Sequence, residues 1–90
     1  MNSVFEALAH PVRRDILKLL RKRAMSAGEL SEHFSIAKPT LSGHFTVLKG
    51  ADLVTTERQG TTIMYHLNTS AMEEALGAFM SLAGVKRKDN

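Results

Sequence analysis

Residues 26–49 read SAGELSEHFSIAKPTLSGHFTVLK, which fits two short helices joined by a tight turn. Ser26 and Glu29 have the spacing of a capping box, so the first helix is predicted to begin near residue 26 and to close near residue 33. The turn falls at residues 35–36, and Pro39 is tolerated near the start of the second helix because its missing N–H group needs no partner there. This stretch therefore predicts a helix-turn-helix.

The second predicted helix, residues 38–49, has an apolar and a polar face. Leu41, Phe45 and Leu48 follow at i, i+4 and i+7 and should point into the core. His44 is expected at the edge of the outer face. The outer face is polar and mostly short-chained, and its members are Lys38, Thr40, Ser42, Gly43, Thr46 and Lys49.

Residues 53–67, LVTTERQGTTIMYHL, are predicted to form a β-hairpin, because β-branched residues flank a glycine turn at Gln59-Gly60. A β-ribbon behind a helix-turn-helix whose second helix is polar on one face is a shape that docks on duplex DNA. The residues of this wing that we expect at DNA are Arg58, Gln59 and Thr61.

Two further helices are predicted before this unit. Ser3 and Glu6 form a second capping-box pattern, and Pro11 is well placed to open the next helix, whose apolar residues 12, 16, 19 and 20 form one stripe. Six basic residues crowd positions 13–23. For this cluster a role at phosphate and an ordinary solvated helix face are both open.

The last predicted helix begins with a third capping-box pattern, Ser70 to Glu73, and Gly84 is a plausible C-terminal cap. Its apolar residues cover well over half of its circumference, which favours pairing with a second copy of the chain; burial within one monomer is the alternative. The interface is expected to use both terminal helices, through Val4, Phe5, Leu8, Met72, Leu76, Phe79, Met80 and Ala83.

Together these patterns predict a mainly α fold with a small β-hairpin, in the order α-α-α-α-β-β-α. This is a winged helix-turn-helix, as a single domain over residues 1–90 that dimerises through its terminal helices. We expect the basic tail at 85–90, which includes Lys86-Arg87-Lys88, to be a solubilising extension that need not be ordered.

Composition and the absence of certain motifs exclude several classes of function. The 90 residues contain no cysteine, which excludes disulfides and thiolate metal sites, and carry a net charge of +3, modest for a nucleic-acid binder. No apolar run approaches the roughly 20 residues of a membrane span, and the first residues lack a signal peptide, so we expect a cytoplasmic protein without membrane insertion. Ser42 and His44 diverge on a helix and no phosphate loop or paired acid motif is present, so we expect no enzyme.

Four segments together resemble the ArsR/SmtB family of winged-helix transcriptional repressors. They read FEALAHPVRRDILKLL (residues 5–20), GEL (28–30), KPTLSGH (38–44) and YHL (65–67). The resemblance covers about residues 3–83, in the family's order and spacing. It implies a homodimer joined through its first and last helices, a recognition helix at 38–50 in the major groove of an operator, and a wing at the backbone or minor groove.

Many members of this family sense metals, but the ligand patterns are missing here. The third helix offers Glu29 and His33 without a cysteine, and residues 70–84 contain neither Asp nor His. Two ligands do not make a zinc site. The chain more closely resembles the short, metal-independent autorepressor branch, for which we expect no metal and no cofactor. The alternatives are a metal-responsive repressor of the same family and a winged-helix protein-interaction module.

Three positions depart from the family pattern. Gly43 stands where relatives often have Arg, His or Gln, and it weakens the helix by about 1 kcal/mol relative to Ala. Ala37 is a poor N-cap where relatives often have Ser. Asp52 replaces the glycine that usually precedes the wing strand, and Asp tolerates positive φ better than most residues do.

The expected contacts follow from chemistry. Lys38 and the helix N-terminus beside it suit phosphate, Thr40 and Ser42 suit base edges, and Pro39 offers apolar contact. Arg58 suits a narrow minor groove. His44 either donates to phosphate or is a packed histidine. For relief of repression the sequence leaves three routes open: protein concentration, a sequestering protein partner, or a small apolar ligand at the dimer interface.

Overall fold

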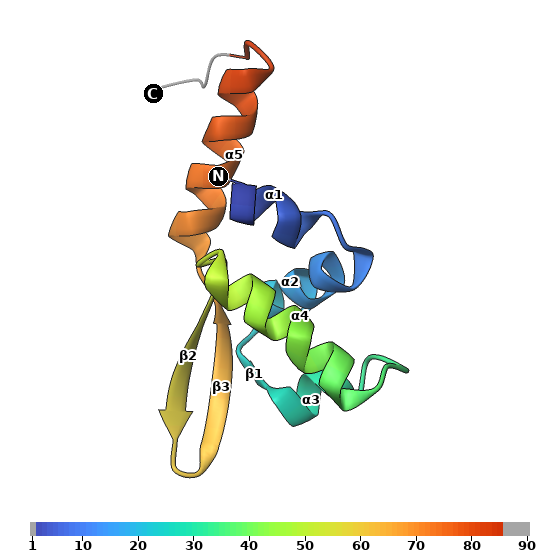
Figure 1. Cartoon of the computed structure of the whole chain (residues 1–90). Coiled ribbons are helices and arrows are strands. Elements are labelled where there is room, and N and C mark those ends of the chain that lie inside the picture. Colours follow the sequence, from blue (N-terminus) through green and yellow to red (C-terminus); the bar gives the residue numbers. More distant parts are fainter. Residues whose placement is uncertain (1, 86–90) are drawn as a thin grey trace.

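The computed structural model describes residues 2–85 and has the predicted winged helix-turn-helix order, with one additional short strand. Helices α1–α4 pack together, the β2–β3 hairpin projects from them, and α5 extends at the opposite end (Figure 1). The basic residues of the tail, at 86–88, lie outside the described residues. The elements are α1 (Asn2–Leu8), α2 (Pro11–Lys22), β1 (Met25–Ser26), α3 (Ala27–Ser31), α4 (Lys38–Gly50), β2 (Val54–Gln59), β3 (Thr62–Leu67) and α5 (Thr69–Leu82).

The core lies where α2, α3, α4 and the base of the wing meet. Its largest fully buried side chains are Ile16, Leu30, Leu48 and Leu53, one from each of these parts. The inward stripe predicted for α4 is confirmed, since Leu41, Phe45 and Leu48 are all buried. Burial of that stripe turns the opposite, polar side of α4 to the solvent.

Of the three predicted capping boxes, one is confirmed and two are wrong. The Glu29 N–H donates to Ser26 Oγ at 3.1 Å, and the Ser26 N–H donates to Glu29 Oε1 at 3.0 Å. Ser3 lies inside α1 instead of capping it. Helix α5 begins after Asn68, whose Oδ1 accepts the Ala71 N–H at 3.2 Å, because asparagine is as good an N-cap as serine.

The sheet has three antiparallel strands in the order β1-β3-β2, where the sequence predicted two. Strand β1 has only two residues, too few to show any alternation, and Met25 is nevertheless buried opposite Tyr65. Gln59 pairs with Thr62, so the hairpin loop consists of Gly60 and Thr61, with Gly60 at a φ of 64°.

Two helix ends use a residue with positive φ, as predicted. Asp52 has a φ of 60° after α4, and the Leu53 N–H donates to the Leu48 carbonyl at 3.1 Å. Gly84 has a φ of 74° after α5 and is followed by a bond of 2.8 Å from the Val85 N–H to the Met80 carbonyl. Both are Schellman ends, which direct the chain away from the helix. Helix α3 closes at Ser31, two residues before the predicted end.

Candidate nucleic-acid interface

The outer face of α4 is polar and exposed. Ala37 stands at the N-cap, and its side chain cannot accept a hydrogen bond. The first N–H groups of α4 are therefore not capped by a side chain at this position. An uncapped helix start attracts anions through these groups and the helix dipole. The predicted contacts that are exposed on α4 are Lys38, Pro39, Thr40, Ser42, Gly43, Thr46 and Lys49.

The hydroxyl groups on this face are not equivalent. Thr46 Oγ1 donates to the Ser42 carbonyl one turn back, at 3.1 Å, so its proton is used within the helix. Thr40 and Ser42 lie closer to the helix start, where short side chains approach base edges most easily. The Thr46 hydroxyl is therefore engaged within the helix, whereas Thr40 and Ser42 are exposed near its start.

His44 does not lie at the edge of the outer face as expected. Only 8% of it is exposed, and its ring packs at 4.4 Å between centroids against the ring of His10. Arg13 Nη1 lies 3.1 Å from His44 Nδ1 and, since a guanidinium only donates, the histidine accepts this bond. Burial beside His10 and Arg13 lowers the pKa of His44. His44 is thus a packed histidine that supports α4 from behind.

The wing presents its predicted residues at its tip. Arg58, Gln59 and Thr61 are exposed, and Gln59 Nε2 donates to Glu57 Oε1 at 3.2 Å. In Figure 1 the hairpin tip and the N-terminal end of α4 lie at the same end of the molecule, opposite α5. This end of the molecule thus combines an uncapped helix start, short polar side chains and a wing tip that carries Arg58 beside Glu57.

Half of the basic cluster at residues 13–23 is engaged within the protein. Arg13 and Arg14 donate to carbonyls near the end of α1, at 2.7–2.9 Å. Arg23 forms an ion pair of 3.0 Å with Glu29. The pKa of Glu29 is lowered first by the backbone N–H of Ser26 and then by Arg23. For Arg13, Arg14 and Arg23 a structural role accounts for the side chain.

A second exposed surface is apolar and lies on α5. Only Ala75 of this helix is buried, whereas Leu76 is 60% and Leu82 74% exposed. Phe79, 43% exposed, packs edge to face on Phe5 of α1 with centroids 4.7 Å apart. The predicted interface set divides here. Val4, Leu8 and Met72 pack partly against the core, Phe5 and Met80 are half-buried, and Leu76, Phe79 and Ala83 are exposed. Leu82 and Val85 are further exposed apolar residues at this end of the chain.

Within residues 2–85, no three His, Asp or Glu side chains come together as metal ligands would. Glu29, one of the two candidates on α3, is already held by Ser26 and Arg23. Among the described helices, none has both the length and the apolar character needed to cross a membrane.

Comparison with known proteins extends these observations. A helix-turn-helix domain family matches residues 8–57. The chain is 39% identical to the transcriptional repressor SdpR of Bacillus subtilis over 90 residues, which are 100% of this chain and 98% of SdpR. It is 40% identical to the arsenical resistance operon repressor of Staphylococcus xylosus over 68 residues, 76% of this chain and 65% of that repressor. The structure is similar to that of an ArsR family transcriptional regulator, with a TM-score of 0.76 and 27% identity over 94% of this chain and 97% of that one.

Proposed function

Because this chain belongs to the ArsR family of winged helix-turn-helix transcriptional repressors, we propose that it binds a palindromic operator as a homodimer and in the cytoplasm. Each copy acts as one winged-helix domain, with α4 in the major groove and the wing at the backbone or minor groove. The observation that most supports this arrangement is the exposed polar face of α4, which begins at an uncapped helix start at the same end of the molecule as the wing tip (Figure 1).

We propose distinct tasks for the contact residues. Lys38 and the first N–H groups of α4 bind phosphate, and Lys49 adds a second cation on the same face. Thr40 and Ser42 read base edges, with Pro39 in apolar contact. Arg58 enters the minor groove or meets phosphate, with Gln59 and Thr61 beside it at the wing tip.

Dimerisation is supported by the exposed apolar surface of α5. A helix with Leu76, Phe79 and Leu82 all exposed is poorly accommodated by one small monomer. Pairing α5 and α1 with their copies buries these side chains and relates two α4 helices by a two-fold axis. Two-fold symmetry in the protein corresponds to a palindromic operator, with half-sites about one helical turn apart.

We propose that repression requires no metal and no cofactor. The chain has no cysteine, and Glu29 on α3 is occupied by a capping box and an ion pair. The main alternative is a metal-responsive repressor, since one relative is a repressor of an arsenical resistance operon. Tight operator binding that is unchanged by a chelator and by added divalent metal or arsenite would exclude that alternative.

The first test is a fluorescence-anisotropy titration against promoter DNA of the chain's own gene and a scrambled duplex, at two salt concentrations, with and without chelator. Tight, sequence-dependent and chelator-insensitive binding is the expected result. Equal binding to both duplexes would mean that the operator lies in other DNA or that the outer face of α4 binds a protein partner. A pull-down then decides between these two explanations.

Substitutions separate base reading from phosphate binding. Thr40→Ala and Ser42→Ala should weaken binding to the operator more than to the scrambled duplex. Arg58→Ala should weaken both and, if Arg58 meets a phosphate, reduce the slope of log affinity against log salt by about one unit. Ser70→Ala, at an exposed serine near the start of α5, is the matched control. Equal losses on both duplexes for all three test variants would contradict the assignment of base readers.

A further inference from the structure

A pocket lies between the recognition helix, α3 and the wing. Its volume is about 280 Å³, it opens to solvent on one side, and α3, α4 and β3 all line it. Small-molecule sites are typically concave and mostly apolar, with volumes from about 300 Å³ upward, so this pocket lies just below that range and has room only for a small ligand. It is separate from the exposed apolar surface of α5.

The floor of the pocket is apolar and aromatic. Leu41 and Phe45 form part of it and are 2% and 6% exposed. The Phe45 and Tyr65 rings lie 4.8 Å apart between centroids, tilted by 36°. Because Tyr65 is only partly buried, a third ring can pack on this pair in offset or edge-to-face contact, which adds to the gain from its burial. The floor therefore favours an aromatic body.

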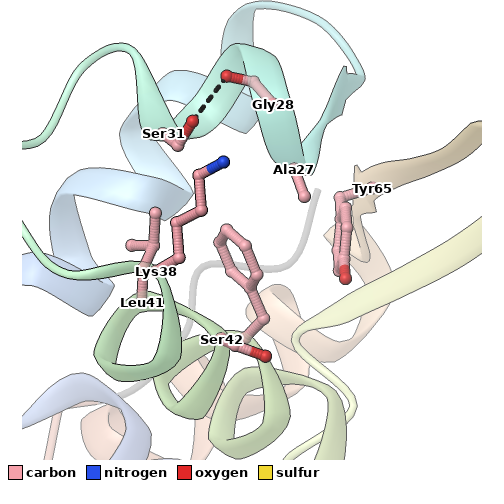
Figure 2. Close-up of a pocket in the computed structure, with 8 residues that line it drawn as sticks. Ala27, Gly28, Ser31, Lys38, Leu41, Ser42 and Tyr65 are labelled. Carbon is pink, nitrogen blue, oxygen red and sulfur yellow. Dashed lines mark hydrogen bonds between the residues drawn. The ribbon is translucent and has the colours of Figure 1, made fainter.

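The polar groups of the pocket are few and lie at its two ends. Figure 2 shows the Lys38 side chain crossing the pocket with its amine near Ser31 of α3, and the hydroxyl groups of Ser42 and Tyr65 away from that amine. Ser31 itself donates to the Gly28 carbonyl at 2.8 Å. Within residues 2–85, Lys38 forms no ion pair with a carboxylate. The pocket thus offers one cation that a ligand anion can satisfy.

We propose that this pocket binds a small aromatic carboxylate, with the ring on Phe45 and Tyr65 and the carboxylate on the Lys38 amine. The regulatory effect of this ligand rests on the proposed function, namely binding of an operator by α4. Lys38 and Ser42 belong to the DNA-contacting face of α4, so the ligand and the operator compete for the same side chains. The ligand then relieves repression directly from beneath the recognition helix.

The test uses 1-naphthoate as the probe and the uncharged 1-naphthamide as its control. Tyr65 is the single tyrosine and the chain has no tryptophan, so the intrinsic fluorescence comes mainly from a residue that lines this pocket. We expect saturable binding of one naphthoate per chain by calorimetry, with quenching of Tyr65 emission by energy transfer. Naphthamide should bind about fivefold more weakly, the usual upper value of a solvent-accessible ion pair.

Two variants test the location. Ala27→Leu fills the pocket from α3, outside the proposed DNA contacts, and should weaken naphthoate binding by at least about tenfold while operator binding persists. Ala9→Leu makes the same exchange at an exposed alanine that does not line the pocket and should change neither. Lys38→Met should abolish the preference for naphthoate over naphthamide.

The results for ligand and DNA are separable, because the naphthoate titration needs no DNA. Absence of saturable binding at millimolar naphthoate, or equal binding of naphthamide, would overturn the ligand assignment even if the operator is bound well. Naphthoate binding that leaves operator affinity unchanged would overturn the competition. Failure to bind any duplex would overturn the proposed function. Calorimetry with naphthoate would still show whether the pocket binds an aromatic carboxylate.

Discussion

Among single residues, Arg13 has the most informative set of contacts. Its Nε donates to the Ala7 carbonyl at 2.9 Å and its Nη2 to the Glu6 carbonyl at 2.7 Å, where α1 ends. Its Nη1 reaches His44 on α4. One guanidinium therefore satisfies carbonyl groups at a helix end and joins α1 to the recognition helix. For Arg13, a member of the basic cluster whose role at phosphate was left open, these contacts indicate a structural role.

This contact predicts a pH dependence of stability. The pKa of His44 is lowered in the folded chain below its ordinary value of 6.5, chiefly by burial and further by His10 and Arg13. The unfolded chain then binds more protons than the folded chain as pH falls below about 6.5, so the stability contributed by neutral His44 is lost in that range. Urea unfolding should show a lower free energy of unfolding at pH 5.5 than at pH 7.5.

Replacing the titrating ring isolates its effect. His44→Asn keeps an oxygen that can accept from Arg13 but cannot titrate, so the loss of stability between pH 7.5 and 5.5 should become smaller. His33→Asn removes an exposed histidine and should leave the loss as it is in the unmodified chain. The same pH response in the unmodified chain and in His44→Asn would contradict the assignment to His44.

Gly43 supplies a second prediction for a single residue. It lies in the interior of α4 without positive φ, and a Cβ built there meets nothing within 4 Å. Gly43→Ala should therefore raise the free energy of unfolding by about 1 kcal/mol. Gly60→Ala is the contrasting control, since the φ of Gly60 is 64° and alanine there should cost about 1 kcal/mol. Chemical denaturation measures the free energy of unfolding of both variants. A loss of stability in Gly43→Ala would contradict the conclusion that a Cβ at this position meets no neighbouring atom.

At the scale of elements, the start of α5 shows how competing caps are decided. Ser70 and Glu73 have capping-box spacing, yet Asn68 caps the helix. Asn68 also donates from Nδ2 to the Asp52 carbonyl at 2.8 Å, which ties the start of α5 to the turn after α4. One side chain thus satisfies a helix N–H and a loop carbonyl together, and Ser70, one residue into the helix, has no such pair of partners.

The cap assignment is tested by two alanine variants. Asn68→Ala should lower the free energy of unfolding by about 1 kcal/mol, because it removes the cap and the bond to Asp52. Ser70→Ala should change it by less than about 0.5 kcal/mol, as expected for an exposed position outside the cap. Thermal or urea unfolding compares them directly, and a larger loss for Ser70→Ala would restore the capping box predicted from sequence.

At the scale of the whole molecule, polar and apolar exposed surfaces lie at opposite ends. The N-terminal end of α4 and the wing tip are at one end and α5 at the other, in a molecule with extents of 43 × 24 × 19 Å (Figure 1). A dimer through α5 would leave both α4 faces free for DNA. The separation of the two surfaces allows association and DNA binding at once.

Association through α5 is open to a direct test. Phe79→Asp places a charge on the exposed apolar surface and should convert a dimer into the 9.9 kDa monomer, as measured by sedimentation equilibrium. Ser81→Asp adds the same charge to the same helix two positions later, on a different side, and should leave the dimer intact. An unchanged mass for Phe79→Asp would refute the proposed interface. Loss of operator binding together with the dimer would support the two-fold arrangement on DNA.

The spacing of residues along the chain determines most of the secondary structure of this protein. The helices, the hairpin, the inward stripe of α4, the positive φ at Asp52 and the end of α5 at Gly84 each depend on residues within a few positions of one another. Local propensity, helical periodicity and turn chemistry act over that range, so the sequence alone predicts them. The polar outer face of α4 follows from the same periodicity.

Tertiary structure decided what depends on residues far apart in sequence. Arg13 and His44 are 31 positions apart, and only the packing of α2 against α4 decides between the two roles left open for His44 and makes it a buried partner of a guanidinium. Strand β1 is a strand because it pairs with β3, with Met25 opposite Tyr65. The bond from Asn68 to the Asp52 carbonyl likewise joins residues 16 positions apart. The pocket beneath α4 likewise exists only where three elements meet. Such contacts arise from packing in three dimensions, which spacing along the chain does not encode.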